Sequence, residues 1–289
     1  LKDGQVCLLE NVRFHPGEME NDPEHSKKLA ELGEIFVNDA FGSAHREQCS
    51  VSGVTKFIET SVAGFLMEKE IEFLVQAIEN PDRPFLAIMG GAKISGKIDV
   101  IQNLLSKVDG ILIGGAMAYT LLKAKGIPVG KSLVEDDRID MAKDVLKAVE
   151  QKGIKFMLPL DHLVAPEVKE GAPVQVTQGV EIPDDQCGVD IGPQTIAAYR
   201  KEIAGAKTIL WNGPMGVFEI PAFAKGTMAI AEALAESKAK TIIGGGDSVS
   251  AVNKAGVADK ITHISTGGGA SLELLEGKPL PGLVTLSDK

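Results

Sequence analysis

A short apolar segment that ends in a glycine-rich turn, followed by a stretch with helical periodicity, recurs five times along this chain. The five apolar segments cover residues 85–89, 110–113, 207–211, 241–243 and 263–266. They are rich in β-branched side chains, as strands buried on both faces of a sheet usually are. Because such strands alternate with helices, we expect an α/β fold whose strands form a parallel sheet with right-handed crossovers.

The glycine-rich turns all follow the carboxyl end of a predicted strand. They cover residues 90–91, 114–115, 212–214, 244–247 and 267–269. In open parallel sheets, ligands bind outside the carboxyl ends of the strands. We therefore expect the five turns to belong to one binding site.

A smaller α/β region precedes these repeats. Residues 6–9 and 35–37 read as strands, and residues 22–32 read as a helix. Residues 64–78 form a further predicted helix, because Met67, Ile71, Leu74 and Ile78 recur at helical spacing. The two prolines within residues 80–84 end this helix, which we expect to join two domains.

The turn after the first of the five strands has features that suit a phosphate group. Residues 91–98 nearly match the P-loop pattern, but Ile98 lacks the hydroxyl that the P-loop offers to magnesium. Glycines let backbone N–H groups approach an anion, and a helix start adds positive potential. Lys93 and Lys97 are four residues apart, so on a helix they would share one face. The alternative is a solvated lysine pair beside a tight turn.

Two later turns offer polar groups at a predicted helix start. Asp247 and Ser248 follow the glycines at 244–246, where Asp247 could act as an N-cap or hold Mg²⁺. Gly267, Gly268 and Gly269 repeat the glycine geometry. Neither turn matches the dinucleotide fingerprint with its acidic residue about 20 positions further on. A Rossmann-type oxidoreductase is therefore disfavoured.

Charge, hydropathy and cysteine content exclude further classes of protein. The formal net charge of −10 opposes nucleic-acid binding by the protein as a whole, and no apolar run reaches the roughly 18 residues of a membrane helix. Cys7, Cys49 and Cys187 are odd in number and lack CxxC spacing. This pattern argues against a disulfide framework and a zinc site, and favours reduced thiols in the cytosol.

Six long motifs, in order, resemble those of phosphoglycerate kinase, and together they extend over essentially the whole chain. The motifs are LLENVRF (8–14), FVNDAFGSAHR (36–46), GGAKISGKI (90–98), WNGPMGVFE (211–219), GGGDS (244–248) and STGGGASLELLEGKPLPG (265–282). The resemblance implies two Rossmann-like domains with parallel sheets and a cleft between them. It assigns residues 1–63 to an incomplete N-terminal phosphoglycerate-binding domain, 64–80 to the interdomain helix and linker, 81–275 to the nucleotide-binding domain, and 276–289 to a segment that returns toward the N-terminal domain.

The activity implied by the resemblance is phosphoryl transfer between 1,3-bisphosphoglycerate and ADP, with Mg²⁺, giving 3-phosphoglycerate and ATP. The resemblance also implies a glycolytic, cytoplasmic protein. At full length it would be a monomer, with no nucleic-acid or membrane partner. Family members also carry a substantial segment before the LLENVRF motif, which includes an arginine expected to help Lys97. A nucleotide-binding fragment without turnover is therefore kept as the alternative function for this chain.

The resemblance also implies a role for individual residues. Arg13, His45 and Arg46 would bind phosphoglycerate, although an isolated arginine is more often a member of a surface ion pair. Lys97 and the turn of Gly267, Gly268 and Gly269 would act on the transferring group. The nucleotide would be bound by Lys93, Lys97, Gly114, Gly115, Gly188, Asn212, Pro214, Glu219, Gly245, Gly246, Asp247 and Ser248, with Asp247 on magnesium.

Overall fold

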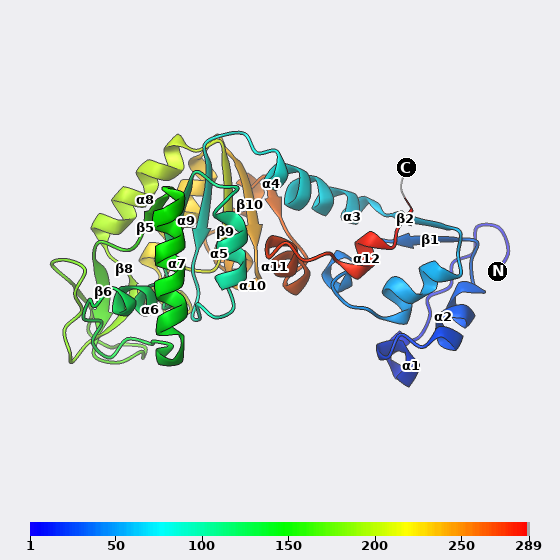
Figure 1. The fold of residues 1–289 in the computed structure, drawn as a ribbon, viewed down its shortest axis with the longest axis horizontal. Helices are drawn as coiled ribbons and strands as arrows, with labels where there is room; N and C mark the ends of the chain where they lie inside the picture. Colours follow the sequence, from blue (N-terminus) through cyan, green and yellow to red (C-terminus); the bar gives the residue numbers. More distant parts are fainter. Residues whose placement is uncertain (288–289) are drawn as a thin grey trace. The chain divides into compact units, whose positions relative to one another are not determined.

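The computed structural model describes residues 1–287, apart from the side chains of Gln76 and Ala77. The chain divides into two compact units (Figure 1). One unit comprises residues 1–72 together with residues from 278 onward, and the other comprises residues 73–277. The division falls within the helix predicted at 64–78.

The larger unit is built on a six-stranded sheet in which every strand pair is parallel, in the order β11-β10-β9-β3-β4-β5. The strands are β3 (Phe85–Met89), β4 (Gly110–Ile113), β5 (Lys155–Met157), β9 (Thr208–Asn212), β10 (Lys240–Gly244) and β11 (His263–Ile264). The five predicted strands are thus confirmed, and β5 was not predicted. The strand order reverses between β3 and β9, so this pair marks the topological switch point, where α/β sheets bind ligands.

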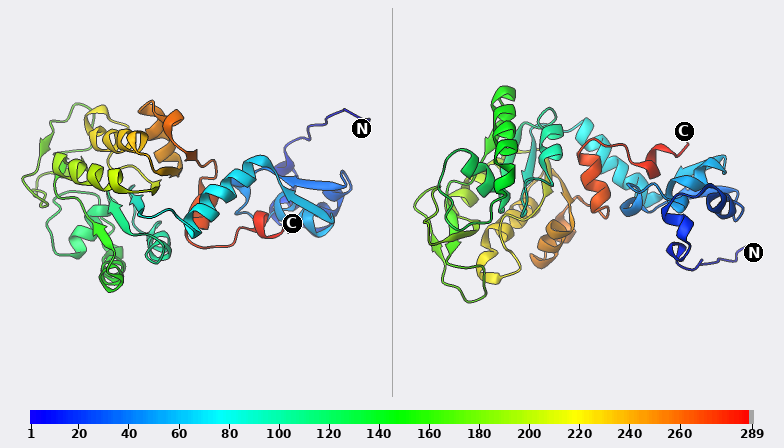
Figure 2. Two further views of the ribbon diagram at one scale, coloured as in Figure 1. Left: turned by 90° about the horizontal axis from the view of Figure 1, so that it is seen from above. Right: turned by 60° about the horizontal axis from the view of Figure 1, so that its bottom comes forward.

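Helices cover both faces of this sheet. They are α5 (Ile98–Leu104), α6 (Met117–Ala124), α7 (Ile139–Lys152), α8 (Pro193–Gly205), α9 (Lys225–Glu236), α10 (Gly246–Lys254) and α11 (Gly269–Leu275). In the left view of Figure 2, α8 to α10 (yellow-green to orange) lie on the opposite side from α5 to α7 (teal to green). The core between them contains fully buried Trp211, Tyr199 and Leu234.

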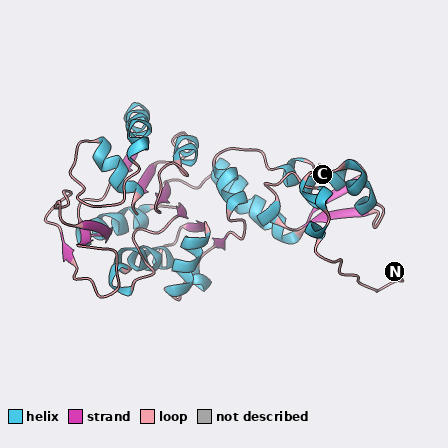
Figure 3. Ribbon diagram, turned by 90° about the horizontal axis from the view of Figure 1, so that it is seen from below, coloured by secondary structure: helices cyan, strands magenta, loops and turns pink. Residues whose placement is uncertain are grey.

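A three-stranded antiparallel sheet adjoins the larger one, and it was not predicted. It orders β7 (Gln175–Val176), β6 (His162–Ala165) and β8 (Cys187–Ile191), and its short strands are visible among long loops in Figure 3. The two pairings of β6 are antiparallel, with a register shift between Leu163 and Val164. Such short, irregular strands carry too few residues for a periodic signal.

The smaller unit pairs β1 (Ile35–Asn38) with β2 (Thr60–Ala63) in parallel. Its helices are α1 (Pro16–Met19), α2 (Pro23–Ala30), α3 (Phe65–Glu70) and α12 (Pro281–Val284). The C-terminal segment packs within this unit: the Gly282 N–H donates to the Ala44 carbonyl at 2.8 Å, and Asn38 Nδ2 donates to the Gly282 carbonyl at 2.9 Å. A strand at 35–37 and a helix within 22–32 are confirmed.

The strand predicted at residues 6–9 is wrong. These residues have no regular structure, and the side chains of Val6 and Leu8 are 93% and 96% exposed. An apolar run becomes a strand only where a neighbouring strand accepts its hydrogen bonds, and within residues 1–287 none does.

The helix predicted at 64–78 is confirmed, with an irregular centre. Helix α3 continues into a π-helical segment (Ile71–Gln76) and then α4 (Ala77–Glu79). The Asp39 carboxylate accepts hydrogen bonds from the N–H groups of Leu66 and Met67 at 2.7 and 3.0 Å, and so satisfies free donors at the helix start.

Candidate functional site

A cavity of about 470 Å³ lies at the carboxyl ends of the strands, on the switch-point side of the large sheet. Four turns line it, those that follow β3, β9, β10 and β11. Its lining residues are Gly91, Ala92, Lys93, Gly96, Lys97, Asn212, Gly213, Gly245, Gly246, Asp247, Ser248, Gly268, Gly269 and Leu272. The fifth predicted turn, at 114–115, packs behind this cavity rather than lining it: the Gly115 N–H donates to the Met215 carbonyl at 2.8 Å.

The two lysines of the turn after β3 both line the cavity, but not for the reason that their spacing suggested. Helix α5 begins at Ile98 with Lys97 at its N-cap position, so Lys93 lies in the preceding loop and not on the same helix face. Lys93 is exposed and Lys97 is half-buried. The turn itself brings both cations to one cavity.

Lys97 is the most constrained cation of the site. Its Nζ donates to the Asn212 carbonyl at 3.2 Å and to the Asn212 side-chain oxygen. Burial lowers the pKa of Lys97 to about 8, and the nearby charge of Asp247 opposes this shift only in part. An anionic ligand in the cavity would favour the charged form of this amine.

The Asn212–Gly213 turn is held by buried contacts. The Ser248 hydroxyl oxygen accepts a hydrogen bond from the Gly213 N–H at 2.6 Å, and Trp211 Nε1 donates to the Gly213 carbonyl at 2.7 Å. Asn212 is 3% exposed, and its Nδ2 has no hydrogen-bond partner among residues 1–287. This Nδ2 group is therefore free to donate a hydrogen bond to a ligand in the cavity, which Asn212 lines.

Asp247 is not an N-cap. Gly245 occupies the N-cap position of α10, and Asp247 is the second residue of the helix. Its carboxylate is exposed, lines the cavity, and makes no side-chain hydrogen bond within the described part of the chain. The first N–H groups of α10 have no intrahelical acceptor, so this helix start can bind an anion.

The glycine turn before α11 contributes two of its three predicted residues to the cavity. Gly268 and Gly269 line it, whereas the Gly267 N–H donates to the Ser265 hydroxyl oxygen at 3.1 Å. The Gly267 amide is therefore engaged inside the turn.

Four further predicted residues lie outside this cavity. Gly114 packs against Met215, and the Pro214 carbonyl accepts from the Gly91 N–H at 2.9 Å. Gly188 lies on β8, where a side chain would overlap the Tyr119 ring. Glu219 is exposed. None of the four lines the 470 Å³ cavity.

The predicted phosphoglycerate residues lie in the smaller unit. Arg13 belongs to a short 3-10 helix (Val12–Phe14), and His45 and Arg46 follow another (Phe41–Ser43). Arg13 and Arg46 are exposed, and none of the three side chains makes a hydrogen bond or ion pair within residues 1–287.

Sequence reasoning missed two buried residues that shape the segment after β9. The Asp190 carboxylate accepts a hydrogen bond from the Gly226 N–H at 2.5 Å, and burial raises its pKa to about 7. The Thr227 hydroxyl oxygen accepts from the N–H groups of Met215 and Gly216 at 3.1 and 3.2 Å. The available sequence signal for Asp190 was its place between the apolar residues Val189 and Ile191. An acid in such a segment is rarely buried without a partner.

Comparison with known proteins identifies the family. A phosphoglycerate kinase family model matches residues 1–278. The phosphoglycerate kinase of Chlorobium luteolum is 59% identical over 290 residues, covering 99% of this chain and 73% of the relative. That of Acidobacterium capsulatum is 60% identical over 291 residues, covering 100% of this chain and 72% of the relative.

Solved structures of phosphoglycerate kinases also match this chain. Phosphoglycerate kinase from Coxiella burnetii superposes with a TM-score of 0.92 at 46% identity, covering 95% of this chain and 71% of that one. The enzyme from Pyrococcus horikoshii gives a TM-score of 0.84 at 35% identity, covering 99% and 73%. These matches do not favour a nucleotide-binding module without turnover. The chain belongs to the phosphoglycerate kinase family.

Proposed function

We propose that this protein transfers a phosphoryl group reversibly between the acyl phosphate of 1,3-bisphosphoglycerate and ADP, giving 3-phosphoglycerate and ATP in glycolysis. The acceptor in the reverse direction is a carboxyl group. One observation carries the nucleotide half of this proposal: Lys93, Lys97 and Asp247 line one cavity, ringed by glycine turns, at the switch point of a parallel sheet.

On the nucleotide side, Lys93, Asn212 and the start of α10 bind the phosphates, and Gly245, Gly246 and Ser248 shape that helix start. Gly114, Gly115, Gly188, Pro214 and Glu219 surround the adenosine. Two observations support this division: none of these five residues lines the phosphate cavity, and Gly114, Gly115 and Pro214 pack against the segment around Gly213 at its edge. On the substrate side, Arg13, His45 and Arg46 bind phosphoglycerate. Their side chains have no competing partner in the described part of the chain, and His45 Nδ1 is a buried atom without a hydrogen bond.

Asp247 fits a magnesium ion that is shared with the nucleotide. Within residues 1–287, no group of three or more His, Cys, Asp and Glu side chains is arranged to hold a metal ion. Magnesium commonly binds through one or two carboxylates plus substrate phosphates, and Asp247 offers such a carboxylate. When bound, the ion would neutralise phosphate charge.

The chain's own residues contribute positioning and charge, which are the main requirements of phosphoryl transfer. Lys97 is held by Asn212 and neutralises charge on the group in transit. Backbone amides of the 267–269 turn assist it, through Gly268 and Gly269 at the cavity wall.

We also infer a cytoplasmic monomer at full length. All three cysteines are free, as in a reducing compartment. No helix within residues 1–287 is long and apolar enough to cross a membrane.

A coupled assay tests the proposal. The intact protein should form ATP from ADP and 1,3-bisphosphoglycerate and require Mg²⁺. A folded protein that binds MgADP but forms no ATP would refute the proposed reaction.

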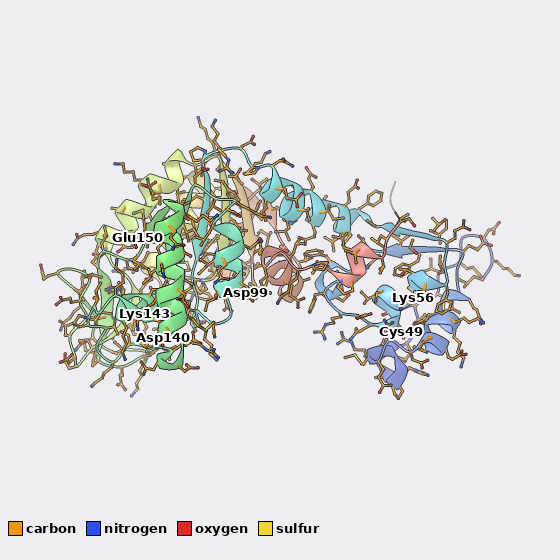
Figure 4. The ribbon with its side chains drawn as sticks, in the orientation of Figure 1. Cys49, Lys56, Asp99, Asp140, Lys143 and Glu150 are labelled. Carbon is orange, nitrogen blue, oxygen red and sulfur yellow. The ribbon has the colours of Figure 1, made fainter. Side chains whose placement is uncertain are left out.

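Asp247→Asn should weaken binding of MgADP by about tenfold or more, and change binding of metal-free ADP much less. The amide preserves the side chain's shape and removes the charge that magnesium requires. Calorimetric titrations with ADP, with and without Mg²⁺, measure the difference. Asp99→Asn is a matched control, because Asp99 is likewise the second residue of its helix, α5, and lies outside the cavity (Figure 4). Equal losses with and without Mg²⁺ would exclude the metal role.

The pH dependence of turnover should follow Lys97. With its pKa near 8 in the free protein, kcat/KM for ADP should be level below that pH and about tenfold lower at pH 9, because only the protonated amine neutralises phosphate. Lys97→Arg keeps a charge at these pH values and should flatten the alkaline limb, even if its plateau is lower. An unchanged alkaline limb in Lys97→Arg would assign the titration to another group.

A further inference from the structure

A single glutamate on a distant loop holds the turn that carries both cavity lysines. Glu135 Oε2 accepts hydrogen bonds from the Ile94 N–H at 2.5 Å and the Ser95 N–H at 3.1 Å. Its Oε1 accepts from the Ser95 hydroxyl at 2.5 Å. Ile94 and Ser95 lie between Lys93 and Lys97, so all three bonds fall on the segment that separates the two cations.

The geometry of Glu135 itself is fixed from the opposite side. Its backbone N–H donates to the hydroxyl of Thr120 at 3.1 Å, and Thr120 is 1% exposed on α6. Glu135 occupies the N-cap position of a short 3-10 helix (Asp136–Arg138), yet its side chain makes no capping bond there. The carboxylate is instead directed at a loop about 40 residues away in the sequence.

The turn needs such a restraint. Gly91 and Gly96 flank the segment, and no atom lies within 4 Å of the position where a Gly96 side chain would be. The other bonds of the turn lie at its two ends or within it: Gly91 bonds to Pro214 and Met117, the Lys97 N–H donates to the Ile94 carbonyl at 2.8 Å, and Lys97 Nζ donates to Asn212. Among the described residues, only Glu135 holds the middle of the turn, at Ile94 and Ser95, from another part of the chain. Because the Ile94 and Ser95 N–H groups donate to the Glu135 carboxylate, they do not bind a phosphate.

We propose that Glu135 is a positioning residue for phosphoryl transfer, which fixes the Lys93–Lys97 turn so that the Lys97 amine meets the transferring group. Glu135 does not touch the substrate, because it does not line the cavity. The inference rests on the proposed function only through the role of Lys97.

The protonation state of Glu135 suits this role. Partial burial opposes its ionisation, but the hydrogen bonds from Ser95 and Ile94 and the charge of Lys93 outweigh burial and hold its pKa below the ordinary value. A depressed carboxyl pKa means that the interaction is fully present above the ordinary pKa and is lost only as the pH falls through the lower, folded-state pKa. The restraint therefore operates across the neutral range.

Glu135→Ala and Glu135→Gln together test the proposal. Alanine removes all three bonds, and kcat of the intact protein should fall by about 10- to 100-fold. Glutamine is isosteric: its carbonyl oxygen can accept both N–H groups, and its amide can donate to the Ser95 oxygen. The Gln variant should therefore retain kcat within about threefold, although it lacks the charge. Glu150→Ala controls for loss of one negative charge, because Glu150 is exposed on α7 (Figure 4), and it should match the wild type.

Hydrogen exchange supplies a readout that does not depend on turnover. The Ile94 and Ser95 amides should exchange faster in Glu135→Ala than in the wild type or Glu135→Gln. If the Ala variant does not fold, Glu135→Asp, whose carboxylate is one methylene short, should change kcat and exchange in the same direction. Unchanged exchange, kcat within twofold of wild type in Glu135→Ala, or equal losses in the Ala and Gln variants would each overturn the positioning role. Absence of turnover in the wild type would instead count against the proposed function, and the exchange data would still decide the restraint.

Discussion

Lys97→Met should lower kcat of the intact protein by about 100-fold or more while leaving nucleotide binding largely intact. The Lys97 amine is held against Asn212 in a partly buried position, where its charge is less screened than on the surface. Its interaction with phosphate is needed most when charge develops on the group in transit, so the loss should appear in kcat and not in KM. Steady-state kinetics with varied ADP measure both.

Lys125→Met is a suitable control for this substitution. Lys125 is an exposed lysine at the end of α6, outside the cavity, so its removal should leave kcat unchanged. A near-normal kcat with a raised KM for ADP in Lys97→Met would show that Lys97 only binds the ground state.

Gly213→Ala should destabilise the larger unit by about 3 kcal/mol, which corresponds to a fall in Tm of roughly 6–12 °C. Gly213 has a φ of 102°, and an added Cβ would overlap the Gly90 carbonyl across the switch point. The backbones of the turns after β3 and β9 meet there, so neither can move away without disturbing the end of its strand. Denaturant unfolding of the Ala variant measures the loss.

Gly96→Ala provides the contrast from the same cavity. No neighbouring atom lies within 4 Å of the added methyl group, so stability should stay within about 0.5 kcal/mol of wild type. Similar unfolding midpoints for the two variants would mean that the close approach at Gly213 does not constrain the fold.

The regular part of the fold could be predicted from sequence because the central strands of the large sheet, β3, β4 and β9, are buried along their whole length. Residues 85–89 are apolar and buried throughout, and 209–211 form the apolar, buried centre of β9, so both segments stand out in the sequence as buried strands. Strands β7 and β5 were not predicted, since they have only two and three residues. Strand β11 is equally short, but the glycine turn at 267–269 marked its position. Residues 6–9 show the converse error, because their apolar character alone says nothing about a strand partner.

The residues that line the candidate site could be predicted better than their geometry. Glycine turns mark where the backbone approaches a ligand, so Lys93, Lys97 and Asp247 were found. Side-chain roles depend on contacts between distant residues, which spacing does not encode. Thus Lys93 was placed on a helix that begins five residues later, at Ile98. Asp190 and Glu135 act through N–H groups 36 and 40 or more residues away, and nothing local to either marks its partner.

Hydrogen exchange of the chain with and without MgADP tests most directly whether the switch-point cavity binds the nucleotide phosphates. The account predicts that MgADP protects amides of the turns that line the cavity, at 91–97, 245–248 and 268–269, while α7, which contributes no residue to the cavity, is unaffected. Protection that mapped to α7 and spared these turns would contradict it.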